Sequence, residues 1–389
     1  MTAGTATRPL PGNATATPTA RLDFLDALRV LAIAVLLFFH TGMLFVGWGW
    51  HITNAQTIPG LRLPMDLLHR LRMPLLFVIA GAGMWYALQR RSLAGFARER
   101  AVRLLLPAVA GMFIVVPPQV FVERVVRGQW QGGYLRFYAE RVLQLRPYPA
   151  GDFGWHHLWF IVYLFVYAML LLPVLAWWRR ARPPYAPGPW VLALGLPLGV
   201  NEALLKPLYP ESHTLIHDAY IFNHYLLLTL YGVALAASRN AWDWLADRRQ
   251  ALLGAALLLS VLGLPMLEMG IVPRDTPADA LYANLFTWAW LLSLLAWGRQ
   301  RLNFATPLLA WAREASFPIY ILHQTVIILI AQVVIRQAWA PWAKFAVILA
   351  GTVVVCVLAH EALLRRFPLT RLLFGIKPGP ARGRVPQGG

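Results

Sequence analysis

Ten apolar segments alternate with short polar connections along most of the chain. Each approaches the length of about 17–25 residues that a helix needs to cross a bilayer. The segments are residues 24–46, 69–89, 104–122, 157–178, 189–206, 219–238, 251–272, 280–298, 316–336 and 342–364. Gly and Pro interrupt the fifth and the seventh, which are therefore the least regular. The pattern predicts an all-α polytopic membrane protein with about ten transmembrane helices, forming a single domain over residues 21–366.

The two ends of the chain lack this apolar pattern. Residues 1–20 are rich in Thr, Ala and Pro, which predicts a disordered tail and not a secretory signal. Residues 367–389 predict a second tail, which is basic. Ten spans put both tails on one side of the membrane. With that side inside, cytosolic segments hold 22 Lys and Arg against 12 in external segments, Arg29 left out, so both termini are expected in the cytosol.

The connection after the third segment departs from this charge rule, because it carries five arginines on the outer side. They are Arg124, Arg127, Arg136, Arg141 and Arg146. An amphipathic helix lying in the membrane interface accounts for them. A binding surface for an anionic or polyhydroxylated acceptor is the alternative, and the sequence leaves both open.

Composition also indicates a membrane protein. The chain is 58% hydrophobic and only 13% charged, whereas soluble domains carry about 25% charged residues. Its 17 tryptophans fit two belts at the membrane interfaces. The net charge of +18 comes from short arginine clusters, a pattern typical of contact with anionic lipid and not with nucleic acid. The single cysteine, Cys356, excludes an internal disulfide and a cysteine-based metal site.

Two ionisable residues interrupt the first apolar segment. Arg29 and His40 are eleven residues apart, so on a helix they share nearly the same face, about 16 Å apart along the axis. Ionisable groups at membrane depth are costly and usually face a bundle interior or a wet cavity. The pair therefore marks a candidate site. The alternative is an arginine that snorkels to the interface and a histidine satisfied within the core.

Basic residues also mark the second and third segments. Arg100 and Arg103, at i and i+3, present two guanidinium forks together, and such forks match phosphate geometry. Anchoring at the cytosolic surface explains the same arginines. His69 and Arg72 share a face at the start of the second segment, as a substrate contact or as a structural anchor. Pro74 follows and suits the first turn of a helix.

The last two segments carry further polar residues. Ser316, Tyr320 and His323 fall on one helical face of the ninth segment, which indicates contact with other protein or with a cavity. Glu361, in the tenth segment, and Arg365, just after it, have i, i+4 spacing, and stabilisation of a helix end is one explanation of this pair.

The remaining histidine pairs do not predict a metal site. His156 and His157 are adjacent, so on a helix their side chains diverge by about 100°. His157 is either an interfacial residue or part of the mouth of an acceptor groove. His213 and His217 have the i, i+4 spacing of metal ligands but lie in a polar loop without an evident third ligand.

Together these residues resemble a known family. Arg29 and His40 form an R-x10-H motif, and Arg100 and Arg103 form an R-x-x-R motif. With the polar face of the ninth segment, they are similar to the bacterial membrane-bound acyltransferase family 3, in particular to a member associated with succinylation of periplasmic glucans. The matching stretches are FLDALR (24–29), RMPLLFVIAG (72–81), RERAVRLLLP (98–107), HLWFIVYL (157–164), SFPIYILH (316–323) and LRRFPLTRLLFGIKP (363–377).

The resemblance implies a ten-span enzyme of the bacterial inner (cytoplasmic) membrane. It implies transfer of an acyl group, acetyl or succinyl, from cytosolic acyl-CoA to an extracytoplasmic glycan hydroxyl, with no permanently bound cofactor. His40 and Arg29 are then catalytic, and Arg100 and Arg103 hold the donor. The resemblance also points, less strongly, to His323, Tyr320 and Glu361.

The chemistry of acyl transfer suits these residues. Transfer to a hydroxyl needs a base, and a neutral histidine at membrane depth can accept the proton. The donor thioester is already activated, so no protein nucleophile is required. A guanidinium stays protonated near neutral pH, which suits Arg29 to an anionic donor or to fixing the bundle and not to proton transfer.

Two other classes of function remain open from the sequence. A glycan or lipid exporter also places ionisable residues at mid-membrane on broken helices, although no repeat relates two halves of this chain. A purely structural or sensory membrane protein leaves the positions of His40 and His323 unexplained. Consumption of labelled acyl-CoA by purified protein distinguishes the enzyme from both.

Overall fold

The computed structural model describes residues 22–181, 186–238 and 240–377, and their regular structure is helical. The tail predicted for residues 1–20, and residues 378–389 of the basic tail, lie outside the described residues. The α-helices are α1 Asp23–Gly42, α2 Arg62–Leu88, α3 Leu93–Arg100, α4 Leu106–Ile114, α5 Val116–Val126, α6 Tyr134–Phe137, α7 Trp159–Leu170, α8 Leu172–Ala181, α9 Trp190–Ala193, α10 Gly195–Leu205, α11 Ala219–Ala237, α12 Ala241–Asp247, α13 Arg249–Glu268, α14 Pro277–Arg301, α15 Pro307–Val334, α16 Pro341–Ala359 and α17 Pro368–Leu373. Shorter turns are the 3-10 helices η1 Pro59–Leu61 and η4 His156–Leu158 and the π-helices η2 Ala101–Leu105, η3 Tyr138–Val142 and η5 His360–Leu364.

Helices occupy all ten predicted apolar segments, and the molecule is a multi-pass membrane protein. In the described chain, seven are long and apolar enough to cross a membrane: Asp23–Gly42, Pro59–Leu88, Leu93–Val126, Ala219–Ala237, Pro277–Arg301, Pro307–Val334 and Pro341–Leu364. His156–Leu170 and Leu172–Ala181 form an eighth candidate, bent by 50°. The irregular fifth and seventh segments give apolar helices that are shorter, Trp190–Leu205 and Arg249–Gly263. The count of ten and the side of the termini stay predictions.

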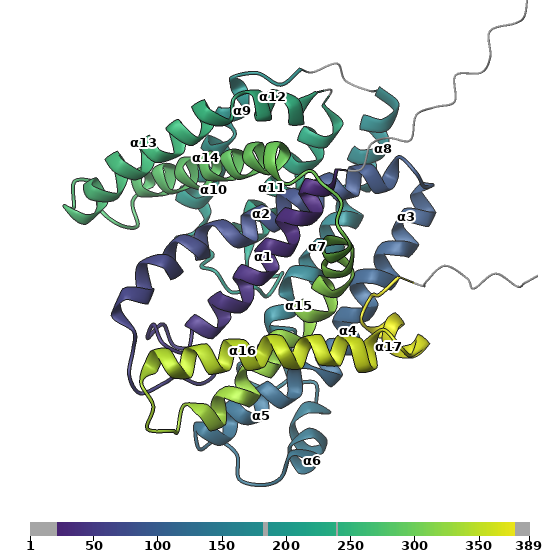
Figure 1. The fold of residues 1–389 in the computed structure, drawn as a ribbon, viewed down its shortest axis with the longest axis vertical. Helices are drawn as coiled ribbons and strands as arrows, with labels where there is room; N and C mark the ends of the chain where they lie inside the picture. Colours follow the sequence, from purple (N-terminus) through teal and green to yellow (C-terminus); the bar gives the residue numbers. More distant parts are fainter. Residues whose placement is uncertain (1–21, 182–185, 239, 378–389) are drawn as a thin grey trace, which may run out of the picture.

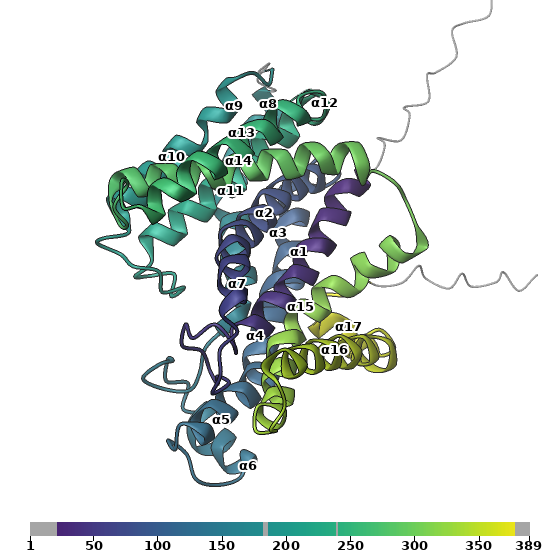
Figure 2. The ribbon, with the colours of Figure 1, turned by 60° about the vertical axis from the view of Figure 1, so that its left-hand side comes forward.

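Helix α1 lies in the middle of the molecule (Figures 1 and 2). It packs against α2, α14, α15 and α16. Its residues Phe24, Leu28, Leu36 and Phe39 recur at helical spacing, and the neighbouring helices bury them. In both views α10, α13 and α14 form a layer at one end of the molecule, and α5 and α6 lie at the other.

The close contact between α2 and α11 depends on glycine. A Cβ atom on Gly81 would overlap the carbonyl oxygen of Thr229, and one on Gly232 would overlap that of Val78. Small residues let two membrane helices approach this closely. Pro74 lies inside α2, which begins at Arg62, so its predicted place in the first turn is wrong. The helix continues outward through polar residues that hid its start in the sequence.

The arginine-rich connection after the third segment is partly helical. Arg124 lies in the last turn of α5, and Arg136 and Arg141 lie in the continuous helical stretch of α6 and the π-turn η3. The interfacial position of this stretch stays a prediction. The side chain of Arg124 is buried, with its Nε 2.5 Å from Oδ1 of Asp152. Arg141 donates to Oδ2 of the same carboxylate at 2.6 Å. Asp152 therefore binds both guanidinium groups, and the helical pattern of the sequence carries no signal of a partner this distant along the chain.

Candidate active site

A cavity of about 600 Å³ lies between α1, α2, α3, α7, α15 and the segment after α17. Its cationic lining residues are Arg29, Arg91, Arg100, Arg103, Arg313 and Lys377, against the acidic Asp26, Glu99 and Glu314. The apolar lining residues include Ile33, Leu76, Ile79, Phe160 and Leu164. Along α1 and α15 the charged lining residues, such as Arg29 and Arg313, come before the large apolar or aromatic ones, such as Ile33 and Tyr320. We call this space the basic cavity; it has a charged end and an apolar end.

Arg100 and Arg103 both line the basic cavity, as their spacing suggested. Arg103 donates to Oε1 of Glu99 at 3.4 Å and to the carbonyl oxygen of Gly375 at 3.3 Å. The guanidinium of Arg100 lies 4.8 Å from the ring centroid of Phe96. Its Nε is buried without a hydrogen-bond partner in the described chain. The π-turn η2 contains Arg103, and such turns are frequent at functional sites.

The C-terminal segment contributes to the same cavity, which the sequence did not suggest. After α17 the chain reverses at Gly375, whose φ of +63° favours glycine. Phe374 and Ile376 are buried, and Gly375, Ile376 and Lys377 line the basic cavity. Part of the predicted basic tail therefore packs against the membrane domain. Only the short apolar turn LLFGI gave any signal of this.

His40 and His323 come together as a hydrogen-bonded pair, with His40 Nδ1 and His323 Nε2 2.7 Å apart. His323 Nδ1 lies 2.6 Å from the carbonyl oxygen of Tyr320. A carbonyl can only accept, so His323 carries its proton on Nδ1, and its Nε2 accepts from His40 Nδ1 when both rings are neutral. This leaves the lone pair of His40 on Nε2. His323 is fully buried, whereas His40 is partly exposed.

Tyr320 connects this histidine pair to the basic cavity. Its side chain lines the cavity, and its hydroxyl donates to the carbonyl oxygen of His157 at 2.5 Å. His157 in turn donates from Nε2 to the carbonyl oxygen of Ile321 at 2.8 Å. The His157 ring lies 5.4 Å from that of His323, between ring centroids. His157 thus joins η4 to α15 within the protein.

Arg29 and Ser316 lie in the basic cavity and not at the histidine pair. Arg29 is 3.1 Å from Asp26, whose other carboxylate oxygen is 3.3 Å from Arg313. Ser316 donates to the carbonyl oxygen of Arg313 at 3.2 Å. The predicted catalytic residues are therefore divided between two places, and the catalytic role of Arg29 stays a prediction.

Arg72 and His69 contact each other on α2, as their spacing suggested, with Arg72 NH1 3.2 Å from His69 Nδ1. The guanidinium of Arg72 stacks on the ring of Phe39, 3.4 Å from its centroid. Phe39 immediately precedes His40, so Arg72 lies beside the histidine pair.

Glu361 belongs to a different place. It accepts from Arg365 at 2.7 Å, the predicted pair, and from the indole of Trp311 at 2.7 Å. These contacts fix the junction of α15 with η5. The structure gives Glu361 no contact with the histidine pair.

A second histidine cluster was missed from the sequence. His51 forms a very short contact with the buried carboxylate of Glu123, and its Nε2 lies 3.2 Å from Nε2 of Gln324. Gln324 follows His323, so this cluster adjoins the histidine pair. Glu123 at the end of an apolar segment was the only available signal. No group of three or more His, Cys, Asp or Glu side chains in the described residues is arranged to hold a metal ion.

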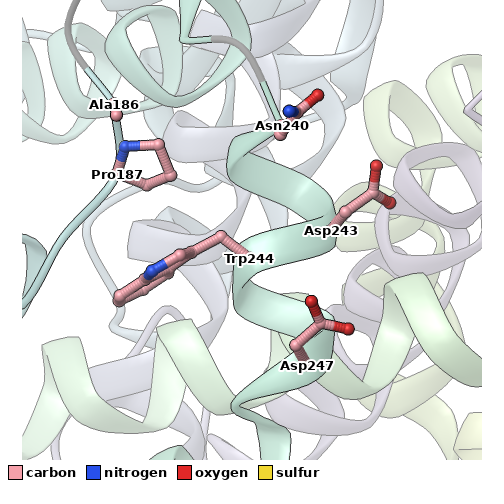
Figure 3. A pocket seen from close by; sticks show the side chains of 6 residues that line it. All are labelled: Ala186, Pro187, Asn240, Asp243, Trp244 and Asp247. Atoms are coloured by element: carbon pink, nitrogen blue, oxygen red, sulfur yellow. The ribbon is translucent and has the colours of Figure 1, made fainter.

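A second hollow, shown in Figure 3, lies apart from these residues. Its lining consists of Ala186, Pro187, Asn240, Asp243, Trp244 and Asp247. Asp243 and Asp247 extend from the same helix, α12, and Asp243 also pairs with Arg299 at 2.9 Å. The hollow contains no predicted site residue, and its acidic lining does not suit an anionic ligand.

Comparison with known proteins identifies the family. The family model described as "Acyltransferase domain", for acyltransferase family 3, matches residues 22–361. Glucans biosynthesis protein C of Salmonella heidelberg and that of Salmonella typhimurium are each 22% identical to this chain over 386 residues, covering 93% of this chain and 96% of the relative. That of Salmonella agona is 22% identical over 387 residues, with the same coverage. No solved structure matches the chain.

The family match confirms the resemblance inferred from the motifs. The matched residues 22–361 contain the R-x10-H motif, the R-x-x-R motif and the polar face of α15. These motifs supply the histidine pair and much of the lining of the basic cavity. The family match also decides against an exporter without acyl chemistry and against a purely structural protein. Because the match runs through nearly the whole helical region, the chain belongs to acyltransferase family 3 and is a multi-pass membrane acyltransferase.

Proposed function

We propose that this acyltransferase moves an acetyl or succinyl group from cytosolic acyl-CoA to a glycan hydroxyl outside the cytoplasmic membrane. The observation that carries the proposal is the position of the histidine pair next to the apolar end of the basic cavity. Tyr320 lines the cavity, and His323 lies less than one helical turn further along α15.

The basic cavity suits the donor from its charged end inward. Its cations outnumber its acidic residues by six to three, and guanidinium groups match the phosphates of CoA. The apolar walls beyond them suit the pantetheine arm. The volume of about 600 Å³ falls within the roughly 300–1,000 Å³ typical of small-molecule sites. The thioester then reaches the level of Tyr320 and the histidine pair.

His40 Nε2 acts as the general base in this proposal. It takes the proton from the acceptor hydroxyl while that oxygen attacks the thioester carbonyl carbon. The C–S bond then breaks, and the departing CoA sulfur takes the proton back from His40. His323 holds the His40 ring by accepting from Nδ1, so that the lone pair on Nε2 is left to accept a proton. The products are the ester and free CoA.

The proposed sides of the membrane are supported by the charge distribution and by the order of the residues along the chain. The positive-inside rule puts Arg100 and Arg103 in the cytosol, where acyl-CoA is made. His40 lies toward the opposite end of α1, beside Trp50, whose ring centroid is 6.0 Å from that of His40. Aromatic faces of this kind stack on sugar rings. The names of the relatives support a glucan as the acceptor.

Binding of acyl-CoA to detergent-purified protein tests the donor part of the proposal. We expect saturable binding that Arg100→Ala/Arg103→Ala weakens at least about tenfold, since each lost charged contact costs on the order of 1.5–3 kcal/mol. Arg90→Ala/Arg98→Ala is the matched control, because both arginines are exposed in the same connection and neither lines the cavity. Equal binding by the first variant and wild type would contradict the proposal. An equal loss of acyl-CoA affinity in both double variants would show only a general attraction between the CoA phosphates and the basic surface.

A further inference from the structure

Arg72 is a buried cation with an unused hydrogen-bonding edge. Only 9% of its surface is exposed. NH1 is directed to His69 and to the carbonyl oxygen of Leu68. Nε is buried and has no hydrogen-bond partner in the described part of the chain. An arginine has five N–H donors and no acceptor, so this edge of the guanidinium is suited to an anion.

The surrounding protein supplies no counter-ion in contact with Arg72. Among the described residues, no carboxylate forms an ion pair with it. Glu211 is the carboxylate whose charge acts on Arg72, but it lies 3.1 Å from His213 Nε2. A buried charge with no counter-ion in contact is costly in an apolar bundle and usually marks a functional site.

Arg72 also lies where the reaction is proposed to occur. Leu76, one turn further along α2 on the same face, lines the apolar end of the basic cavity. Phe39, on which the guanidinium stacks, precedes His40. Arg72 is among the charged groups close enough to act electrostatically on His40. Stacking on Phe39 and the contact with His69 restrict the guanidinium to one orientation, as preorganised catalysis requires.

We infer that Arg72 is the oxyanion-stabilising residue of the acyl transfer. The inference rests on the proposed function and adds a catalytic residue to it. When the hydroxyl oxygen attacks, the carbonyl π electrons move to the thioester oxygen, which becomes an oxyanion as the proton moves to His40. Arg72 donates hydrogen bonds to that oxyanion. When the C–S bond breaks, the carbonyl re-forms, the sulfur takes the proton, and Arg72 is again without an anion.

Steady-state kinetics of purified protein with acetyl-CoA, succinyl-CoA and a glucan acceptor tests this role. Arg72→Met removes the charge and keeps an unbranched side chain. We expect it to lower kcat about 10²–10³-fold for both donors, the usual effect of losing one oxyanion donor, with the Kd for CoA within about twofold of wild type. Arg72→Lys should retain part of kcat. Arg70→Met, two residues away on the same helix, is the matched control and should keep wild-type kinetics.

Chemical rescue separates a charge role from damage to the fold. Arg72→Ala should regain kcat when guanidinium ion is added below denaturing concentration, and urea, which is similar in shape but neutral, should not restore it. No rescue together with lost CoA binding in all three Arg72 variants would overturn the inference in favour of a structural role.

Two further outcomes would also overturn it. Arg72→Met with kcat within a few-fold of wild type would show that the oxyanion does not need this residue. A loss confined to the KM for succinyl-CoA would show that Arg72 binds the distal carboxylate of that acyl group instead. Wild-type protein inactive with every acyl-CoA is a separate result, because it would reject the proposed function itself.

Discussion

Two acceptors decide where the protons of the histidine pair lie. The carbonyl oxygen of Tyr320 fixes the proton of His323 on Nδ1, and His323 Nε2 then fixes that of His40. The proposed base is thus His40 Nε2, and no carboxylate contacts the pair in the described residues. This differs from the usual arrangement, in which an acidic residue orients a catalytic histidine. A neutral partner leaves the net charge of the buried pair at zero before the reaction.

The first prediction concerns these two histidines. His40→Ala should lower kcat about 10²–10⁴-fold, the range expected for a lost general base, with CoA binding unchanged. His323→Ala should cause a smaller loss, because His323 orients the base and does not touch the hydroxyl. Initial rates of CoA release with a glucan acceptor measure both. A His40→Ala enzyme with full activity, or a larger loss from His323→Ala, would contradict these roles.

The second prediction concerns the buried carboxylate of the outer connection. Asp152 is 1% exposed and accepts from Arg124 and Arg141. Asp152→Asn removes the closest counter-ion of the buried Arg124 and leaves it only Glu123, 4.0 Å away, so we expect the free energy of unfolding to fall by about 3 kcal/mol. Glu140→Gln breaks an exposed pair with Arg136 and should cost at most about 1 kcal/mol. Thermal unfolding in detergent compares the two; equal effects would show that the Asp152 network adds no stability.

At the scale of helices, the sequence predicted which residues share a helix face better than it predicted where a helix begins. The 3.6-residue period correctly placed Tyr320 and Ser316 on one cavity-lining face and paired His69 with Arg72. It misplaced the start of α2, because the outer turns of that helix are polar and their hydrogen bonds, not their hydrophobicity, make them helical. Pro74 was consequently placed in a first turn when it lies within the helix.

The third prediction concerns the α2–α11 contact. Gly81→Ala places a methyl group against the carbonyl of Thr229, so the two helices must separate. We expect a loss of about 1–3 kcal/mol in the free energy of unfolding, the usual cost of overpacking. Gly254→Ala on α13 is the control: nothing lies near the added Cβ, and alanine favours the helix by up to about 1 kcal/mol. If the Gly81→Ala protein unfolds at the same temperature as wild type, α2 and α11 do not pack as closely as described here.

At the scale of the whole molecule, the sequence alone could not predict which helices meet. His40 and His323 are 283 residues apart in the chain. Periodicity within each helix does not predict a contact between helices. The family resemblance pointed to both residues but did not predict that they contact each other. The same holds for His51 with Glu123 and for the C-terminal segment in the basic cavity, where the partners lie on separate elements. The pattern of a single helix indicates candidate site residues, but it carries no information on which helices contact each other.

The fourth prediction concerns the orientation of the molecule. Cys356→Ala removes the only cysteine, after which single cysteines at Arg98 and Gln131 report on the two ends. Both positions are exposed, in α3 and in the loop before α6. A membrane-impermeant thiol reagent should label Gln131→Cys in intact cells and Arg98→Cys only after permeabilisation. The reverse pattern would place the basic cavity outside and remove its access to cytosolic acyl-CoA.

Transfer across a sealed membrane tests the central claim most directly. Purified protein is reconstituted into vesicles that contain a glucan acceptor, and labelled acyl-CoA is added only outside. We predict labelled glucan inside the vesicles with wild type, and none with His40→Ala although that variant still binds CoA. Acylation only when donor and acceptor share one side, or equal transfer by His40→Ala, would contradict a donor cavity that delivers its acyl group through the bundle to His40.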